Sequence, residues 1–72
     1  MLTIYVIYDH PQDYPDNFVV RTQTPDKNGA IAYGLPTLCD TLTEARQVVP
    51  PGLYRLPRMP GDDVHGIVEC WL

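Results

Sequence analysis

The sequence predicts a small α+β fold, a single mostly antiparallel sheet with element order β-β-β-α-β-β and one helix packed on one face. Three observations predict it. Runs of β-branched and aromatic residues of strand length alternate with turn residues along the 72-residue chain. One stretch, 40–49, carries helix start and stop signals. The length allows one domain, residues 1–72, that can bury only about 60% of the surface of its unfolded chain.

The first half of the chain predicts three strands. Leu2 to Tyr8 is rich in β-branched and aromatic residues with apolar side chains on both faces, which indicates a place near the centre of the sheet. Residues 9–16 contain prolines and aspartates and predict a loop. Phe18 to Thr24 predicts a second strand, and the turn at 25–29 leads to a short third strand, Ala30 to Tyr33. Three successive strands predict a meander.

The predicted helix runs from Asp40 to Val49. Thr41 followed three residues later by Glu44 matches a capping box, in which both side chains satisfy backbone N–H groups at the helix start. Pro50 and Pro51 end the helix. The apolar positions share one side, which must pack on a sheet, and are Leu42, Ala45, Val48 and Val49.

Two strands are expected after the helix. Leu53 to Leu56 predicts a brief strand, residues 57–66 form a polar connection, and Ile67 to Leu72 predicts the last strand.

Composition and charge argue against several functions. The net charge is −4 and only five residues are Lys or Arg, which argues against nucleic-acid binding. No apolar run approaches the length of a membrane span, and the N-terminus lacks the basic region of a signal peptide, so we expect a cytoplasmic protein. The chain contains no serine, which excludes a Ser-His-Asp triad, and no glycine-rich phosphate loop. We therefore expect no cofactor.

The two cysteines, Cys39 and Cys70, lack the spacing of a zinc site, and we expect both to be reduced. Cys39 is the better placed of the two for a nucleophile, because a helix N-terminus lowers the pKa of a thiol. No catalytic signature surrounds either cysteine.

One short helix can cover only one face of a five-stranded sheet, which predicts an interface on the other face. Apolar side chains of the first and last strands, Tyr5, Ile7, Trp71 and Leu72, are expected to contribute to that uncovered face. We expect a sheet-mediated homodimer or an unidentified protein partner there. The alternative is that the long loops fold over this face.

Two acidic loops, 9–16 and 62–65, are the candidate metal site. If the first and last strands are antiparallel neighbours, the loops meet and bring both histidines near several carboxylates, which are ligands for divalent metals. The candidate ligands are Asp9, His10, Asp13, Asp63 and His65. The alternative is that these aspartates hydrogen-bond nearby backbone N–H groups in turns.

Several runs carry a resemblance that spans most of the chain. They are residues 9–11 with 13–16, residues 50–58 with 60–63, and the ending 67–72. Together they resemble short bacterial proteins of unknown function. The resemblance implies no catalytic residue and no ligand. We therefore expect a small non-catalytic interaction or binding module; the alternative is a metal-dependent enzyme or metal-binding protein that uses the acidic loops.

Overall fold

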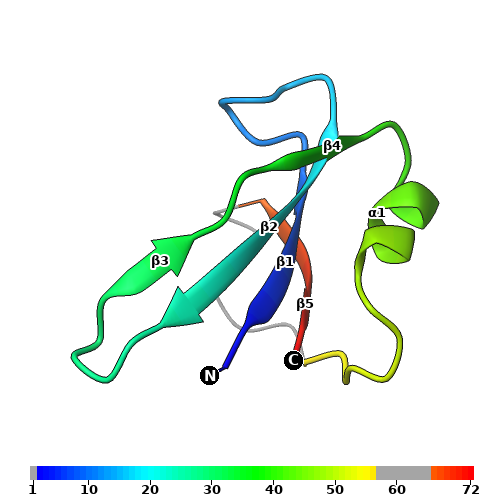
Figure 1. Cartoon of the computed structure of the whole chain (residues 1–72). Helices are drawn as coiled ribbons and strands as arrows, with labels where there is room; N and C mark the ends of the chain where they lie inside the picture. Colours follow the sequence, from blue (N-terminus) through cyan, green and yellow to red (C-terminus); the bar gives the residue numbers. More distant parts are fainter. Residues whose placement is uncertain (1, 57–65) are drawn as a thin grey trace.

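A computed structural model describes residues 2–56 and 66–72 of the chain. Within them an antiparallel sheet packs against one short helix, so the predicted α+β class is confirmed (Figure 1). The strand order is β3-β2-β1-β5, with β4 also paired to β2. The elements are β1 (Ile4–Asp9), β2 (Phe18–Pro25), β3 (Ile31–Tyr33), β4 (Thr37–Cys39), α1 (Leu42–Val48) and β5 (Ile67–Trp71).

The order of the elements differs from the predicted one in two respects: four strands, not three, precede the helix, and one strand, not two, follows it within the described residues. The additional strand is β4, which pairs with β2. Conversely, the strand predicted at 53–56 is reduced to one bridge between Arg55 and Trp71. The segment still lies along β5, because the Tyr54 N–H donates to the Leu72 carbonyl and the Leu72 N–H to the Tyr54 carbonyl, both at 2.9 Å.

A bulge separates β3 from β4 along the same edge of β2. Gln23 pairs with Tyr33 and Val20 with Thr37, so two residues of β2 oppose three residues, 34–36, of the outer strand. Gly34 sits in this bulge, where its N–H donates to the Thr22 carbonyl at 2.9 Å. A Cβ atom at position 34 would lie 2.1 Å from Thr22 Oγ1, so the close approach requires glycine. Because β4 has only three residues and follows a bulge that contains Pro36, the sequence pattern did not predict it.

The helix begins at Leu42, two residues after the predicted start, with Thr41 as its N-cap. Thr41 Oγ1 accepts a hydrogen bond from the Glu44 N–H at 3.1 Å, as the capping box predicts. The Glu44 carboxylate reaches one residue further back than expected and accepts from the Asp40 N–H at 3.0 Å. Val49 is the C-cap, just before the two prolines.

The core under the helix consists of Ile7, Val20, Cys39 and Ala45. Tyr5 and Trp71 pack against this cluster, and Ile7 is 0% exposed. The expectation that Tyr5, Ile7 and Trp71 line the uncovered face is therefore wrong. The side chains of β1 are apolar on both faces, so alternation alone does not tell which face the helix covers.

The face without the helix carries the opposite set of side chains. Val6 and Val19 belong to it, and both are only 2% exposed. The 10–17 loop contributes to this face, because Pro11 and Asp13 line a pocket together with Tyr8, Val19 and Arg21. The 10–17 loop therefore borders this face at the pocket, and the alternative that the long loops fold over the face stays a prediction.

No helix in residues 2–56 and 66–72 is both long and apolar enough to cross a membrane.

Candidate functional site

The two outer edges of the described sheet differ. Beyond β5 lies the segment 54–56, which hydrogen-bonds to that strand. Beyond β3 and β4 no further strand pairs within residues 2–56 and 66–72. In Figure 1 the β2–β3 hairpin forms an arm that projects away from α1. The β3–β4 edge is therefore the candidate functional site, because an unpaired edge is a template for another strand.

The backbone of this edge presents hydrogen-bonding groups that have no strand partner in the described part of the chain. In an antiparallel pair, residues alternate between those bonded to the neighbouring strand and those directed away from it. The N–H groups of Gly34 and Asp26 donate to the carbonyls of Thr22 and Ala30, so even-numbered residues of the hairpin bond across it. The N–H and C=O groups of Ile31 and Tyr33 consequently point away from β2.

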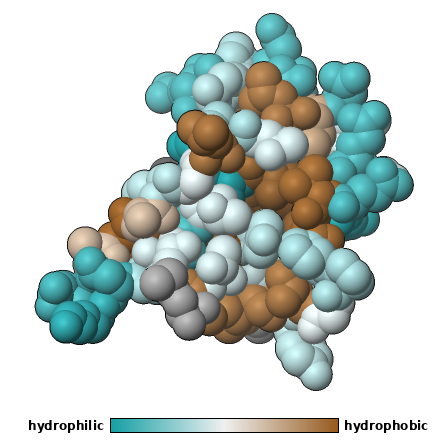
Figure 2. Space-filling model, viewed as in Figure 1, coloured by the Kyte–Doolittle hydropathy of each residue, from teal (hydrophilic) through white to brown (hydrophobic). Residues whose placement is uncertain are grey.

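Large apolar side chains accompany these backbone groups. Ile31, Tyr33 and Leu38 pair with Pro25, Gln23 and Val19, which places them on the face without the helix. Their exposed fractions are 45%, 60% and 48%, and that of Leu35 in the bulge is 92%. Figure 2 shows hydrophobic surface along the arm next to its hydrophilic tip. The edge therefore combines open backbone with apolar surface.

One device that normally prevents strand pairing is missing from this edge, and two others are confined to its middle. Exposed edges are commonly protected by charged side chains, especially lysine, by proline or by bulges. No residue from Ala30 to Cys39 is charged. Pro36 lies in the bulge and leaves β3 itself unprotected.

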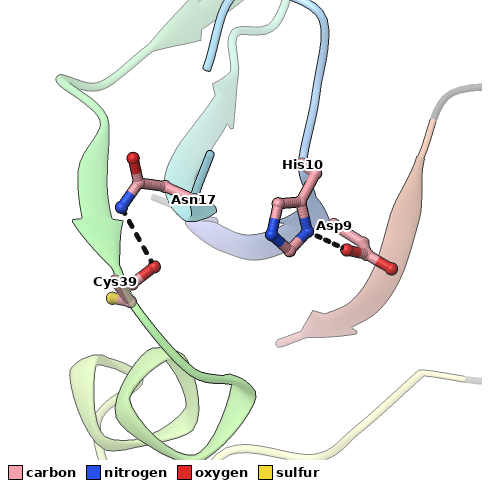
Figure 3. Close-up of polar contacts among 4 residues, drawn as sticks. All are labelled: Asp9, His10, Asn17 and Cys39. Atoms are coloured by element: carbon pink, nitrogen blue, oxygen red, sulfur yellow. Dashed lines mark hydrogen bonds and ion pairs between the residues drawn. The ribbon is translucent and has the colours of Figure 1, made fainter. Parts of the chain in front are cut away.

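The described members of the predicted metal site do not converge. Asp9 Oδ1 contacts Nδ1 of the adjacent His10 (Figure 3), whereas Asp13 Oδ2 lies 3.9 Å from Arg21 Nη2. Among the residues that the structure describes, no three His, Cys, Asp or Glu side chains form a group able to hold a metal ion. Asp63 and His65 lie outside the described residues. The metal site therefore stays a prediction. The three described candidates, Asp9, His10 and Asp13, do not by themselves form a set of metal ligands.

His10 instead has contacts typical of a loop residue. Its φ of 47° lies in the left-handed region, and its N–H donates to the Asn17 carbonyl at 3.0 Å. The imidazole packs edge-on against Phe18, with ring centroids 4.9 Å apart. Asn17 in turn donates from Nδ2 to the Cys39 carbonyl at 3.4 Å (Figure 3). These contacts fix the loop between β1 and β2.

Cys39 is placed poorly for nucleophilic chemistry. The residue is 5% exposed, and burial raises the pKa of its thiol, with the carboxylates of Glu44 and Asp40 adding to the rise. A protonated thiol is a weak nucleophile. Cys39 and Cys70 are both free cysteines in the structure.

An ion pair between buried Glu69 of β5 and half-exposed Arg46 of the helix links the two elements, and the sequence interpretation missed it. Glu69 is 6% exposed and faces the helix. Its Oε1 accepts from Arg46 Nε at 2.7 Å and also contacts Arg46 Nη2, and its Oε2 accepts from Trp71 Nε1 at 3.0 Å. The sequence signal for this contact was Glu69 itself, a glutamate inside an apolar strand. A carboxylate buried there needs a hydrogen-bonding or charged partner. This cluster holds the helix on the sheet.

The sequence interpretation also missed the edge residues. It placed the interface at Tyr5, Ile7, Trp71 and Leu72, whereas the exposed apolar side chains of the sheet edge are Ile31, Tyr33, Leu35 and Leu38. Leu72 is partly exposed, and its backbone is paired with Tyr54. The signal that could have found the edge is the uncharged run 30–39, which follows a hairpin turn.

Comparison with known protein families, with characterised proteins and with solved structures gives no significant match. The resemblance to short bacterial proteins therefore stays a prediction. Any functional conclusion has to come from the geometry of the chain itself.

Proposed function

We propose that this chain is a small non-catalytic interaction module that forms a homodimer through its sheet. The β3–β4 edge of one copy pairs antiparallel with the same edge of a second copy. The observation that carries the proposal is an uncharged edge with exposed apolar side chains and no strand partner among residues 2–56 and 66–72. Strand addition of this kind draws affinity from main-chain hydrogen bonds and selectivity from the adjacent side chains.

The edge is complementary to itself. About a twofold axis through Ala32, Ile31 of one copy lies opposite Tyr33 of the other. Both residues direct their backbone groups outward, so this pair is of the hydrogen-bonded type. The same arrangement repeats on the other side of the axis, as in the twofold interfaces of homodimers. Because the edge carries no charge, no like-charge repulsion opposes the pairing.

The side chains support the same arrangement. Ile31 and Tyr33 lie on one face of the sheet, so the pairing places an aliphatic side chain opposite an aromatic ring twice. Pairs of aromatic and β-branched residues each contribute about 0.2–1 kcal/mol in antiparallel sheets. A pairing this short forms a small interface, and small interfaces are typical of weak complexes. We therefore expect a dimer whose population depends on concentration.

The test is the mass in solution, measured by light scattering on a sizing column over a range of concentrations. The wild-type chain should shift from monomer to dimer. Tyr33→Lys should weaken the dimer at least about tenfold, because a lysine at an edge opposes pairing. Tyr54→Lys is the matched control, since Tyr54 is 81% exposed and lies beside the opposite edge. A wild-type monomer at all concentrations, or equal losses in both variants, contradicts the proposal.

We further propose that the protein acts in the cytoplasm, the compartment in which free thiols such as those of Cys39 and Cys70 stay reduced. The metal-dependent alternative draws no support from residues 2–56 and 66–72. Zinc titration followed through the His10 ring signals tests it directly, since a site at the acidic loops must shift them.

A further inference from the structure

The tip of the β2–β3 hairpin carries an asparagine directly before a glycine, Asn28 and Gly29. All of residues 26–30 are exposed, at the end of the arm that projects away from α1 (Figure 1). A glycine has no Cβ atom, so little hinders its backbone nitrogen when it approaches the side chain of the residue before it. Apart from the two chain neighbours of Gly29, no atom of the described residues lies within 4 Å of the position that a Cβ atom would take there. The tip therefore has the residues and the open space for a reaction between the Asn28 amide and the backbone.

That reaction is an intramolecular deamidation. The Gly29 nitrogen loses its proton to hydroxide or a buffer base and attacks Asn28 Cγ, so a bond forms between the Gly29 nitrogen and Cγ. The bond between Cγ and Nδ2 then breaks, and Nδ2 takes up a proton from water and leaves as ammonia. Water opens the resulting cyclic succinimide at one of its two carbonyls, which gives aspartate or isoaspartate at position 28. Nothing is oxidised or reduced, and water is the co-reactant.

The folded turn opposes this attack. The Gly29 N–H donates to the Asp26 carbonyl at 3.2 Å, which closes a four-residue turn. The Asp26 carboxylate adds two hydrogen bonds, because its Oδ1 accepts from the Asn28 N–H at 2.8 Å and from the Ala30 N–H at 3.0 Å. Attack on Asn28 Cγ requires the Gly29 nitrogen to lose both its proton and this conformation. The turn must therefore open locally before the reaction can proceed.

We propose that Asn28 is a modification site that converts spontaneously to isoaspartate and aspartate, and that the Asp26 carboxylate sets the rate by keeping the turn closed. Hydrogen bonds in an exposed turn contribute little net free energy, so the turn opens often. Asn17, the other asparagine of the chain, is the internal reference. It precedes the bulky Phe18, and its Nδ2 donates to the Cys39 carbonyl at 3.4 Å. Asn28 should convert, and Asn17 should stay intact.

Isoaspartate at position 28 changes the hairpin as well as its charge. The backbone then runs through the former side chain, which adds one methylene group to the turn. The register of a hairpin depends on the length and type of its turn. The bond from the Asp26 N–H to the Ala30 carbonyl, 2.8 Å long in the unmodified chain, is therefore expected to be lost. The reaction itself does not depend on the proposed dimer.

The test is incubation of the full chain at physiological temperature and mildly alkaline pH, with peptide mass spectrometry at intervals of days. Conversion of an amide to an acid raises the mass, and electron-transfer fragmentation distinguishes isoaspartate from aspartate. A synthetic peptide of residues 24–32, which lacks the rest of the sheet, gives the rate without the fold. The peptide should convert faster than the folded chain.

Asp26→Ala should convert Asn28 about tenfold faster than the wild type, because it removes both hydrogen bonds to Oδ1. Asp26→Asn keeps a side-chain oxygen that can accept, and its rate should lie closer to that of the wild type. Asp16→Ala, at an exposed aspartate outside the hairpin, is the matched control and should convert at the wild-type rate.

Hydrogen exchange of the Gly29 amide, measured by NMR in the same variants, should rise in parallel with conversion, since both events need the open turn. Circular dichroism verifies that each variant is folded. Three results would overturn the proposal: an Asn28 that stays intact in the folded wild type for several weeks, an Asn17 that converts as fast as Asn28, or equal rates in Asp26→Ala and the wild type.

Discussion

Removal of Arg46 should destabilise the fold far more than removal of an exposed arginine. Glu69 has a side chain that is 5% exposed and has two partners, Arg46 and Trp71. Arg46→Met keeps helix propensity and most of the aliphatic stem. It leaves the carboxylate buried with only the Trp71 N–H as a partner.

The magnitude follows from the burial of the two groups. Breaking a fully buried ion pair by removing one partner costs about 3–5 kcal/mol. The Arg46 side chain is 49% exposed, so water can partly replace it, and we expect a loss of about 2–4 kcal/mol in the free energy of unfolding. A domain of this size has a total stability of about 4–11 kcal/mol. The urea midpoint should therefore fall by about 2 M, if ΔG changes by about 1–2 kcal/mol per molar urea.

The assay is urea unfolding followed by far-UV circular dichroism and by the fluorescence of Trp71, the single tryptophan of the chain. Glu69→Gln should cost less than Arg46→Met, because the half-exposed guanidinium can turn to water and Gln can still accept from Trp71. The double variant should cost less than the sum of the single variants by about 1–2 kcal/mol. Arg55→Met serves as the control, with an expected change within about 0.5 kcal/mol. Additive losses, or an Arg46→Met loss equal to the control, would refute the reasoning.

Two further predictions concern the helix cap and the alkaline limit of stability. Thr41→Ala removes the acceptor for the Glu44 N–H and should lower the free energy of unfolding by about 1 kcal/mol in urea titrations; no change would show that the cap is not formed. Burial raises the pKa of Tyr8 above its ordinary value of 10.0, so the folded chain holds this proton more tightly than the unfolded chain does. The resulting contribution to stability is present below pH 10 and is lost as the pH rises through the folded pKa. Tyr8→Phe should therefore lose less stability than the wild type as the pH rises above about 10, and equal losses in both proteins would contradict the assignment.

The helix could be predicted from sequence because its signals are local. Thr41, Glu44 and the prolines after Val49 act within a few residues of each other, and the observed helix lies inside the predicted range. The long strands were predictable for the same reason. β4 was not, because it has three residues and follows a bulge that contains Gly34 and Pro36.

The choice of faces and edges could not be predicted, because it depends on contacts between distant segments. Both faces of β1 are apolar, so the sequence of β1 does not determine which face of the sheet the helix covers. The pairing of β1 with β2 and the Arg46–Glu69 contact determine that face. Tyr5 and Trp71 therefore pack against the core on the helix side of the sheet and not on the uncovered face. The segment 54–56 covers one edge of the sheet, whereas no segment of residues 2–56 and 66–72 pairs with the outer side of the β3–β4 edge.

The most direct test of the central claim is an isotope-filtered NOE experiment on a mixture of labelled and unlabelled chains at about millimolar concentration. A homodimer through the β3–β4 edge predicts intermolecular NOEs between Ile31 of one copy and Tyr33 of the other, confined to residues 30–39. Absence of intermolecular NOEs, or NOEs centred on Tyr54 at the opposite edge, would contradict the account.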